Sequence, residues 1–113
     1  MIKIKRVYDP ASSEDGKRIL IDRLWPKGIR KEKARIDEWL QDLGPSDDLR
    51  KWFSHDPYKY ELFKKRYLNE LEKKTELLNK IRTQAQEGTV TLLFSARDTE
   101  HNNATALKEL LSQ

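Results

Sequence analysis

The chain has 113 residues, of which 37% are charged and 36% hydrophobic, with a formal net charge of +4. This length fits one domain, residues 1–113, whose core can form without disulfides. The absence of cysteine excludes disulfides, cysteine-based zinc sites and thiol catalysis, and no apolar run is long enough for a signal peptide or a membrane span. We therefore expect a cytoplasmic protein that does not contact the membrane.

The first two predicted elements are strands. Residues 2–8 alternate apolar and basic side chains, which is typical of a strand. The segment "RILIDRLW", which begins at Arg18, is continuously apolar at its centre and is typical of a strand buried on both faces. The link between the two is short for a parallel crossover unless "PASSED" forms a helical turn.

Two helices are predicted next. Residues 31–44 place Ile36, Trp39, Leu40 and Leu43 on one side and end at a glycine, which predicts a helix with Trp39 facing the core. Residues 45–53 predict a short helix, with Ser46 as N-cap and acidic residues in its first turn.

The second half of the chain predicts a long helix, a strand and a closing helix. Residues 57–86 carry one apolar stripe, including Phe63 and Tyr67, behind an Asp-Pro start signal. "TVTLLFSA" follows as a strand, and residues 102–111 as a helix. The pattern predicts an α/β fold with three layers, in which a mainly parallel sheet of three or more strands is covered by helices.

Two of the apolar strands end in the same way. "ILIDRLWPKG" leaves its strand at Asp22 and Arg23, and "LLFSARDTEHNN" leaves its strand at Arg97 and Asp98. In open α/β sheets, ligands bind outside the carboxyl ends of the strands. The two charged pairs therefore predict a site in which Arg23 and Arg97 bind an anion and Asp22 or Asp98 acts as a base or orients a water.

Strand geometry limits how these charges can meet. Neighbouring residues on a regular strand point to opposite faces, so a cross-strand arrangement is favoured, with Asp22 near Arg97 or Arg23 near Asp98. The alternative is structural, with the charges forming ion pairs that brace the end of the sheet.

Other side chains extend the candidate site. Asn102 lies at the start of the closing helix, where an anion can bind, although helix capping is its favoured role. Tyr8 follows the first strand and fits the core as well as the site. His55 could act as an acid near neutral pH, although a surface position is favoured.

Common catalytic and binding motifs are absent. No phosphate-binding glycine loop, dinucleotide-binding motif or zinc-protease motif occurs, and no carboxylates show metal-ligand spacing, so we expect neither a cofactor nor a metal. The basic runs "KGIRKEKAR" and "FKKRY" are typical of solvated faces, which makes nucleic acid the less favoured partner.

Several segments together resemble one family. "RVYDP", "DGKRILIDRLWPKG", "GPSDDLRKWFSHDP" and "VTLLFSARDTEHNNA" occur in this order and resemble the YeaO-like branch of the DUF488 domain-of-unknown-function family. The resemblance covers almost the whole chain. It implies a small cytosolic α/β protein with a shared site, and it adds Arg6 and Arg50 to the ligand-binding candidates.

Three functions remain open at this stage. The first is binding of a small phosphate- or carboxylate-bearing molecule at the strand ends, with or without a reaction in which His55 is the acid. The second is a nucleic-acid-binding accessory role for a basic helical face, which salt-sensitive binding would favour. The third is an interaction module without chemistry. The sequence leaves substrate, reaction and oligomeric state open.

Overall fold

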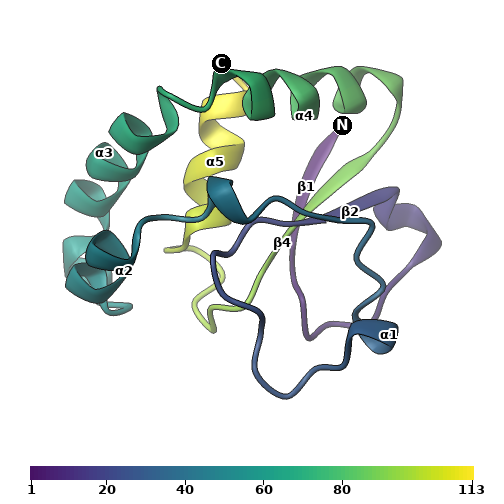
Figure 1. The fold of residues 1–113 in the computed structure, drawn as a ribbon, viewed down its shortest axis with the longest axis horizontal. Helices are drawn as coiled ribbons and strands as arrows, with labels where there is room; N and C mark the ends of the chain where they lie inside the picture. Colours follow the sequence, from purple (N-terminus) through teal and green to yellow (C-terminus); the bar gives the residue numbers. More distant parts are fainter.

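The computed structural model describes residues 1–113, and its centre is a parallel four-stranded sheet (Figure 1). The strands lie in the order β1-β4-β2-β3, and every neighbouring pair is parallel. Their bounds are Ile2–Arg6 for β1, Lys17–Leu20 for β2, Glu38–Trp39 for β3 and Val90–Phe94 for β4. The predicted α/β class is confirmed, as is the parallel pairing of the second and third predicted strands, now β2 and β4. All carboxyl ends therefore meet at one edge of the sheet.

Helices account for most of the remaining chain. They are α1 (Lys31–Ala34), α2 (Asp47–Phe53), α3 (Tyr60–Leu71), α4 (Thr75–Glu87) and α5 (Asn103–Leu111), with 3-10 turns η1 (Ser13–Asp15), η2 (Gln41–Leu43) and η3 (Pro57–Lys59). In Figure 1, α2, α3 and α5 lie together to one side of the strands, and α1 lies apart from them. None of the helices combines the length and the apolar character that crossing a bilayer requires.

The two faces of the sheet bury different side chains. Alternate residues of β2 and β4, such as Ile19 and Leu92, join the main core with Phe63 and Tyr67 of α3. The intervening residues Leu20 and Leu93 form a smaller cluster with Val7, against which Trp25, Ile29 and Ile36 pack. The predicted inward orientation of Phe63 and Tyr67 is confirmed. The sheet is the middle of three layers, with helices on one face and the segment around residues 25–36 on the other.

The prediction of one helix over residues 31–44 is wrong. The only α-helix there is α1, and it ends where Arg35 adopts left-handed backbone geometry, with φ 50° and ψ 47°. The chain then forms β3 and η2, and Trp39 is 38% exposed rather than buried. Tertiary contacts override the helical periodicity of this segment.

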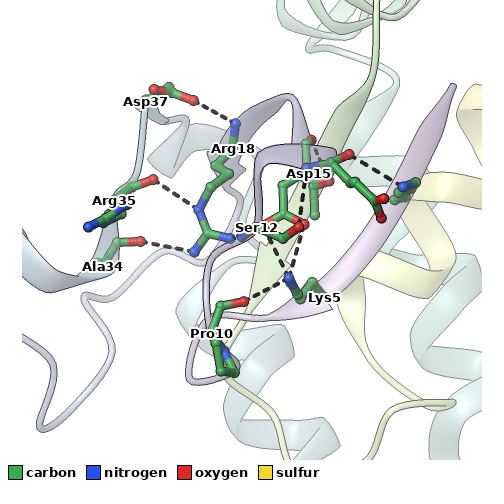
Figure 2. Close-up of polar contacts among 11 residues, drawn as sticks. Lys5, Pro10, Ser12, Asp15, Arg18, Ala34, Arg35 and Asp37 are labelled. Atoms are coloured by element: carbon green, nitrogen blue, oxygen red, sulfur yellow. Dashed lines mark hydrogen bonds and ion pairs between the residues drawn. The ribbon is translucent and has the colours of Figure 1, made fainter.

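Arg18 supplies the main contacts that stop this helix (Figure 2). Its guanidinium group donates to the carbonyl oxygens of Ala34 and Arg35, both at 2.9 Å, and its backbone N–H donates to the Asp37 carboxylate at 2.8 Å. The backbone carbonyls of Ala34 and Arg35, which would accept hydrogen bonds inside a longer helix, thus accept them from Arg18 of β2 instead. The following residues are free to pair with β2 as an edge strand.

The prediction of one helix over residues 57–86 is also wrong. The helix is divided into α3 and α4 by a break at residues 72–74, which belong to the polar segment "EKKT". This segment has no apolar side chain that could pack on the core, so a straight continuation of the helix would gain little stability from packing. The break lets Lys80 and Gln84 of α4 donate to the carboxylate of Glu38, at the edge strand β3.

Local capping signals are confirmed. The Ser46 hydroxyl accepts the N–H of Leu49 at the start of α2, and the Asp56 carboxylate accepts the N–H of Tyr58 in η3. The short link between β1 and β2 contains the turn η1, and β4 lies between the two strands that it connects. The link therefore crosses over β4, and it contains the helical turn that the sequence required of it.

Candidate functional site

A cavity of about 330 Å³ lies at the carboxyl edge of the sheet. Six of the nine predicted site residues line it: Tyr8, Asp22, Arg23, Arg50, His55 and Asn102. The other three, Arg6, Arg97 and Asp98, are not among its lining residues. Its position matches the place where open parallel sheets bind ligands, and its volume is at the lower end of the range for small-molecule sites.

Asp22 is held at the cavity by neighbours from two other elements. One carboxylate oxygen accepts the Ser95 backbone N–H at 2.9 Å and the Ser95 hydroxyl at 2.6 Å, and the other accepts the Asn103 side-chain amide at 3.0 Å. The predicted pairing of Asp22 with Arg97 is therefore not formed. These three hydrogen bonds join the ends of β2 and β4 to the start of α5, so Asp22 has a bracing role.

Arg23 is occupied in a similar way. Its guanidinium group donates to the carbonyl oxygens of Gly44 at 2.9 Å and Pro45 at 3.0 Å, and it has no ion pair with Asp98. These bonds hold the residues that precede α2 against the end of β2. Arg23 thus positions a wall of the cavity, and part of its hydrogen-bonding capacity is already used.

The close approach of Gly44 to this strand end leads to a stability prediction. A Cβ atom at Gly44 would lie 2.4 Å from the backbone nitrogen of Arg23. We expect Gly44→Ala to lower the free energy of unfolding by about 1–3 kcal/mol, because the backbone must shift to admit the methyl group. Urea denaturation measures the change, and Gly88→Ala, where a Cβ meets nothing within 4 Å, is the control. Equal effects of the two substitutions would contradict this packing.

Arg50 presents a different situation. It lies on α2, and its Nε atom is buried with no hydrogen-bond partner. Its only ion pair joins Nη2 to the Asp47 carboxylate at 3.4 Å, on the same helix. The side chain as a whole is 39% exposed, so the accessible part of its guanidinium group is a candidate for contact with a ligand.

His55 lies just after α2 and lines the same cavity. Ser54 and His55 both have positive φ angles, of 48° and 58°, which are uncommon outside glycine. His55 is exposed, in agreement with the favoured expectation, and its ring centroid lies 6.2 Å from that of Phe53. The left-handed turn brings His55 to the cavity that Arg50 also lines.

Arg97 and Asp98 turn away from the cavity. Arg97 is exposed, and the Asp98 carboxylate accepts the backbone N–H groups of Glu100 and His101 and pairs with the His101 ring at 3.0 Å. The two backbone hydrogen bonds lower the pKa of Asp98. Its role is to fix the turn that leads into α5, and the structure does not bring Arg97 together with Arg23.

The remaining predicted residues also have structural partners. Arg6 donates to the carbonyls of Ala96 and Ser95 and lies over the Tyr8 ring, 5.1 Å from its centroid. The Tyr8 hydroxyl donates to the Lys27 carbonyl at 2.8 Å. Asn102 is the N-cap of α5, where its side-chain oxygen accepts the N–H of Thr105, so its expected capping role is confirmed.

Sequence reasoning missed several lining residues as parts of a site. Phe53 and Phe63 lie on α2 and α3 and carry the ordinary signal of core residues, and Ser95 is a small polar residue at a strand end. Only a hydrogen-bonding partner such as Asp22 gives Ser95 a role, and the sequence does not reveal that partner. Trp25 also lines the cavity.

The hydrogen bonds already made within the protein determine which groups of the cavity can bind a ligand. The carboxylate of Asp22 accepts three hydrogen bonds from the protein, whereas the Arg50 side chain has one ion pair and is 39% exposed, and His55 is exposed. Lys27 lines the mouth and is also exposed. The capacity left for a ligand is mainly cationic or hydrogen-donating. No group of three histidine, aspartate or glutamate side chains lies close enough together to hold a metal.

A comparison with protein families identifies the family to which the chain belongs. A family model described as "Inactive DUF488-N3 subclade" matches residues 1–113. The chain belongs to the DUF488 family. It is similar to "Uncharacterized protein YeaO" of Escherichia coli (strain K12), with 43% identity over 110 residues that cover 97% of this chain and 96% of that protein. The YeaO-like resemblance is therefore confirmed.

Mycobacterial proteins are also similar to this DUF488 member. "Uncharacterized protein Rv3073c" of Mycobacterium tuberculosis (strain ATCC 25618 / H37Rv) is 35% identical over 111 residues, which cover 98% of this chain and 93% of that protein. "Uncharacterized protein Mb3100c" of Mycobacterium bovis has the same identity and coverage. No solved structure matches the chain.

Proposed function

We propose that this DUF488 protein binds a small phosphate- or carboxylate-bearing molecule in the cavity at the strand ends and does not transform it. The observation that carries the proposal is the guanidinium group of Arg50, a side chain that lines the cavity, is 39% exposed and has one ion pair, at 3.4 Å to Asp47. An anionic oxygen in the cavity would pair with the exposed part of this group, and a charge-assisted hydrogen bond of this kind is stronger than a neutral one. His55 and Lys27 add hydrogen-donating groups to the same cavity.

The occupied state of Asp22 supports binding without catalysis. A general base needs a free lone pair directed at the proton that it removes. Ser95 and Asn103 already use three of the roughly four lone-pair sites of the Asp22 carboxylate, and the other predicted base, Asp98, fixes a turn outside the cavity-lining set. The word "inactive" in the description of the matching subclade agrees with this proposal.

A thermal-shift experiment at low ionic strength tests anion binding. Ligand at a hundred times its dissociation constant adds about 2.7 kcal/mol of stability, which corresponds to a shift on the order of 10 °C for a domain of this size. A panel of inorganic phosphate, nucleotides, sugar phosphates and carboxylic acids is expected to contain stabilising members. Arg50→Gln should abolish the shift, because it replaces the charged guanidinium group with a shorter neutral amide.

Two matched variants serve as controls. Arg82 of α4 and Arg97 lie outside the cavity-lining set, so Arg82→Gln and Arg97→Gln should retain the shift. A parent protein that no anion stabilises, or an Arg50→Gln variant that keeps the full shift, would overturn the proposal. If ³¹P NMR shows that the protein converts a bound phosphate ester, the non-catalytic part of the proposal is overturned. Salt-sensitive binding of an oligonucleotide that Arg50→Gln leaves unchanged would instead support the nucleic-acid alternative.

A further inference from the structure

Aromatic rings enter the cavity from two separate parts of the fold. Tyr8 and Trp25 belong to the segments that follow β1 and β2, whereas Phe53 and Phe63 belong to α2 and α3. Arg50, one helical turn before Phe53, lines the cavity with them. A cationic donor and several rings therefore share one small space.

These rings are held by contacts within the protein. The Trp25 indole N–H donates to the Ile29 carbonyl at 2.9 Å, and the Trp39 ring packs edge-on against it with the centroids 5.4 Å apart. Phe53 stacks on Phe63 at 4.2 Å, and both are buried. Because the rings are already fixed, a ligand that packs on them does not have to order them, and this raises its affinity.

We infer that the ligand carries a planar aromatic ring next to its anionic group, an inference that rests on the proposed binding of the anion by Arg50. Among the polar side chains that line the cavity, Asp22, Arg23 and Ser95 already make hydrogen bonds within the protein, so apolar and aromatic surface supplies contacts beside those to the anion. Aromatic pairs prefer edge-on or offset contacts, which are worth about 0.5–1.5 kcal/mol beyond the area that they bury. A phosphate or carboxylate without a ring would leave this surface in contact with water.

Paired probes separate the ring from the anion. Isothermal titration calorimetry compares phenyl phosphate with methyl phosphate, and benzoate with acetate, so the arms also distinguish phosphate from carboxylate. We expect the aromatic member of the preferred pair to bind at least about tenfold more tightly, which combines stacking with burial of the ring. Phenol, which has the ring without the anion at neutral pH, should bind more weakly than either aromatic anion.

Substitutions at Trp25 test where the ring binds. Trp25→Leu should bring the affinities of phenyl and methyl phosphate to within about threefold of each other, because it removes the aromatic contact while leaving Arg50 in place. Trp25→Phe, which keeps a ring, should retain most of the preference. Trp52→Leu is the matched control, since Trp52 does not line this cavity, and it should leave the preference unchanged.

Each outcome decides between the two proposals. Equal affinity for both members of each pair in the parent protein would overturn the aromatic inference and leave anion binding intact. Failure of all four anions to bind would overturn the proposed function as well. If Trp25→Leu does not fold, transferred nuclear Overhauser effects between the phenyl protons of the probe and the Trp25 indole of the parent protein decide the matter. Their absence in a complex that binds would overturn the inference.

Discussion

Arg18→Ala is expected to lower the free energy of unfolding by about 3–5 kcal/mol, as is typical when one member of a buried ion pair is removed. The guanidinium group of Arg18 lies 2.6 Å from the carboxylate of Asp15, and both side chains are buried. The same guanidinium group also donates hydrogen bonds to the backbone carbonyls of Ala34 and Arg35 (Figure 2). The substitution leaves two carbonyls unpaired and weakens the attachment of the segment that leads into β3.

Chemical denaturation of the parent and two further variants measures this effect. Arg18→Lys should lose less stability than Arg18→Ala, because a lysine can still pair with Asp15 but cannot reach both carbonyls in the planar geometry of a guanidinium group. Arg30→Ala is the control, since Arg30 is exposed and makes no side-chain cap, and its effect should stay within about 0.5 kcal/mol. A loss below about 1 kcal/mol for Arg18→Ala would show that the network does not hold the fold together.

The fold could be predicted from the sequence where local signals agree with tertiary packing. The apolar centres of β2 and β4 predicted strands that are buried on both faces, and Ser46 and Asn102 marked the starts of α2 and α5. The segment between residues 31 and 44 could not be predicted in this way. Its helical periodicity competes with the long-range hydrogen bonds of Arg18, and no local pattern reveals those bonds.

The candidate site was predictable in its position more than in its chemistry. The rule that ligands bind at the carboxyl ends of parallel strands led to Tyr8, Asp22 and Arg23, all of which line the cavity. The same rule also led to Arg97, but the chain has turned outward by that point, after Ala96. The availability of a side chain for a ligand depends on its partners in three dimensions. Asp22 accepts three hydrogen bonds from Ser95 and Asn103, whereas Arg50 has one ion pair and is 39% exposed, and the sequence gives no sign of this difference.

Two carboxyl groups make the stability of the fold sensitive to acid. Burial alone raises the pKa of Asp15, but the hydrogen bonds from the Ser12 backbone, Lys5 and Arg18 outweigh this effect and lower the pKa from 3.8 to about 2. At β3, the hydrogen bonds from Lys80 and Gln84, followed by that from Lys17, lower the pKa of Glu38 from 4.5 to about 2 against the effect of burial. Both groups therefore remain ionised in the folded state at a pH where they take up protons in the unfolded chain.

The sign of the resulting pH dependence follows from these shifts. A carboxyl whose pKa is lower in the folded state contributes stability that is fully present above its unfolded pKa and is lost as the pH falls through the folded pKa. We expect the free energy of unfolding to be steady above pH 5 and to fall by several kcal/mol between about pH 4.5 and pH 2, since each pKa unit corresponds to about 1.4 kcal/mol. Urea denaturation across this range measures the fall.

Substitution of Glu38 isolates one of the two contributions. Glu38→Gln removes the titrating group at β3 and leaves the Asp15 network in place, so the variant should be less stable than the parent at pH 7 and should lose less stability on acidification. The two denaturation curves should converge near pH 2, where the parent carboxyl is itself becoming protonated. Exposed Glu76 of α4 supplies the control, because Glu76→Gln should follow the parent at every pH. A Glu38→Gln variant whose stability difference from the parent stays constant down to pH 2 would show that the ion pairs of Glu38 with Lys80 and Lys17 do not lower its pKa.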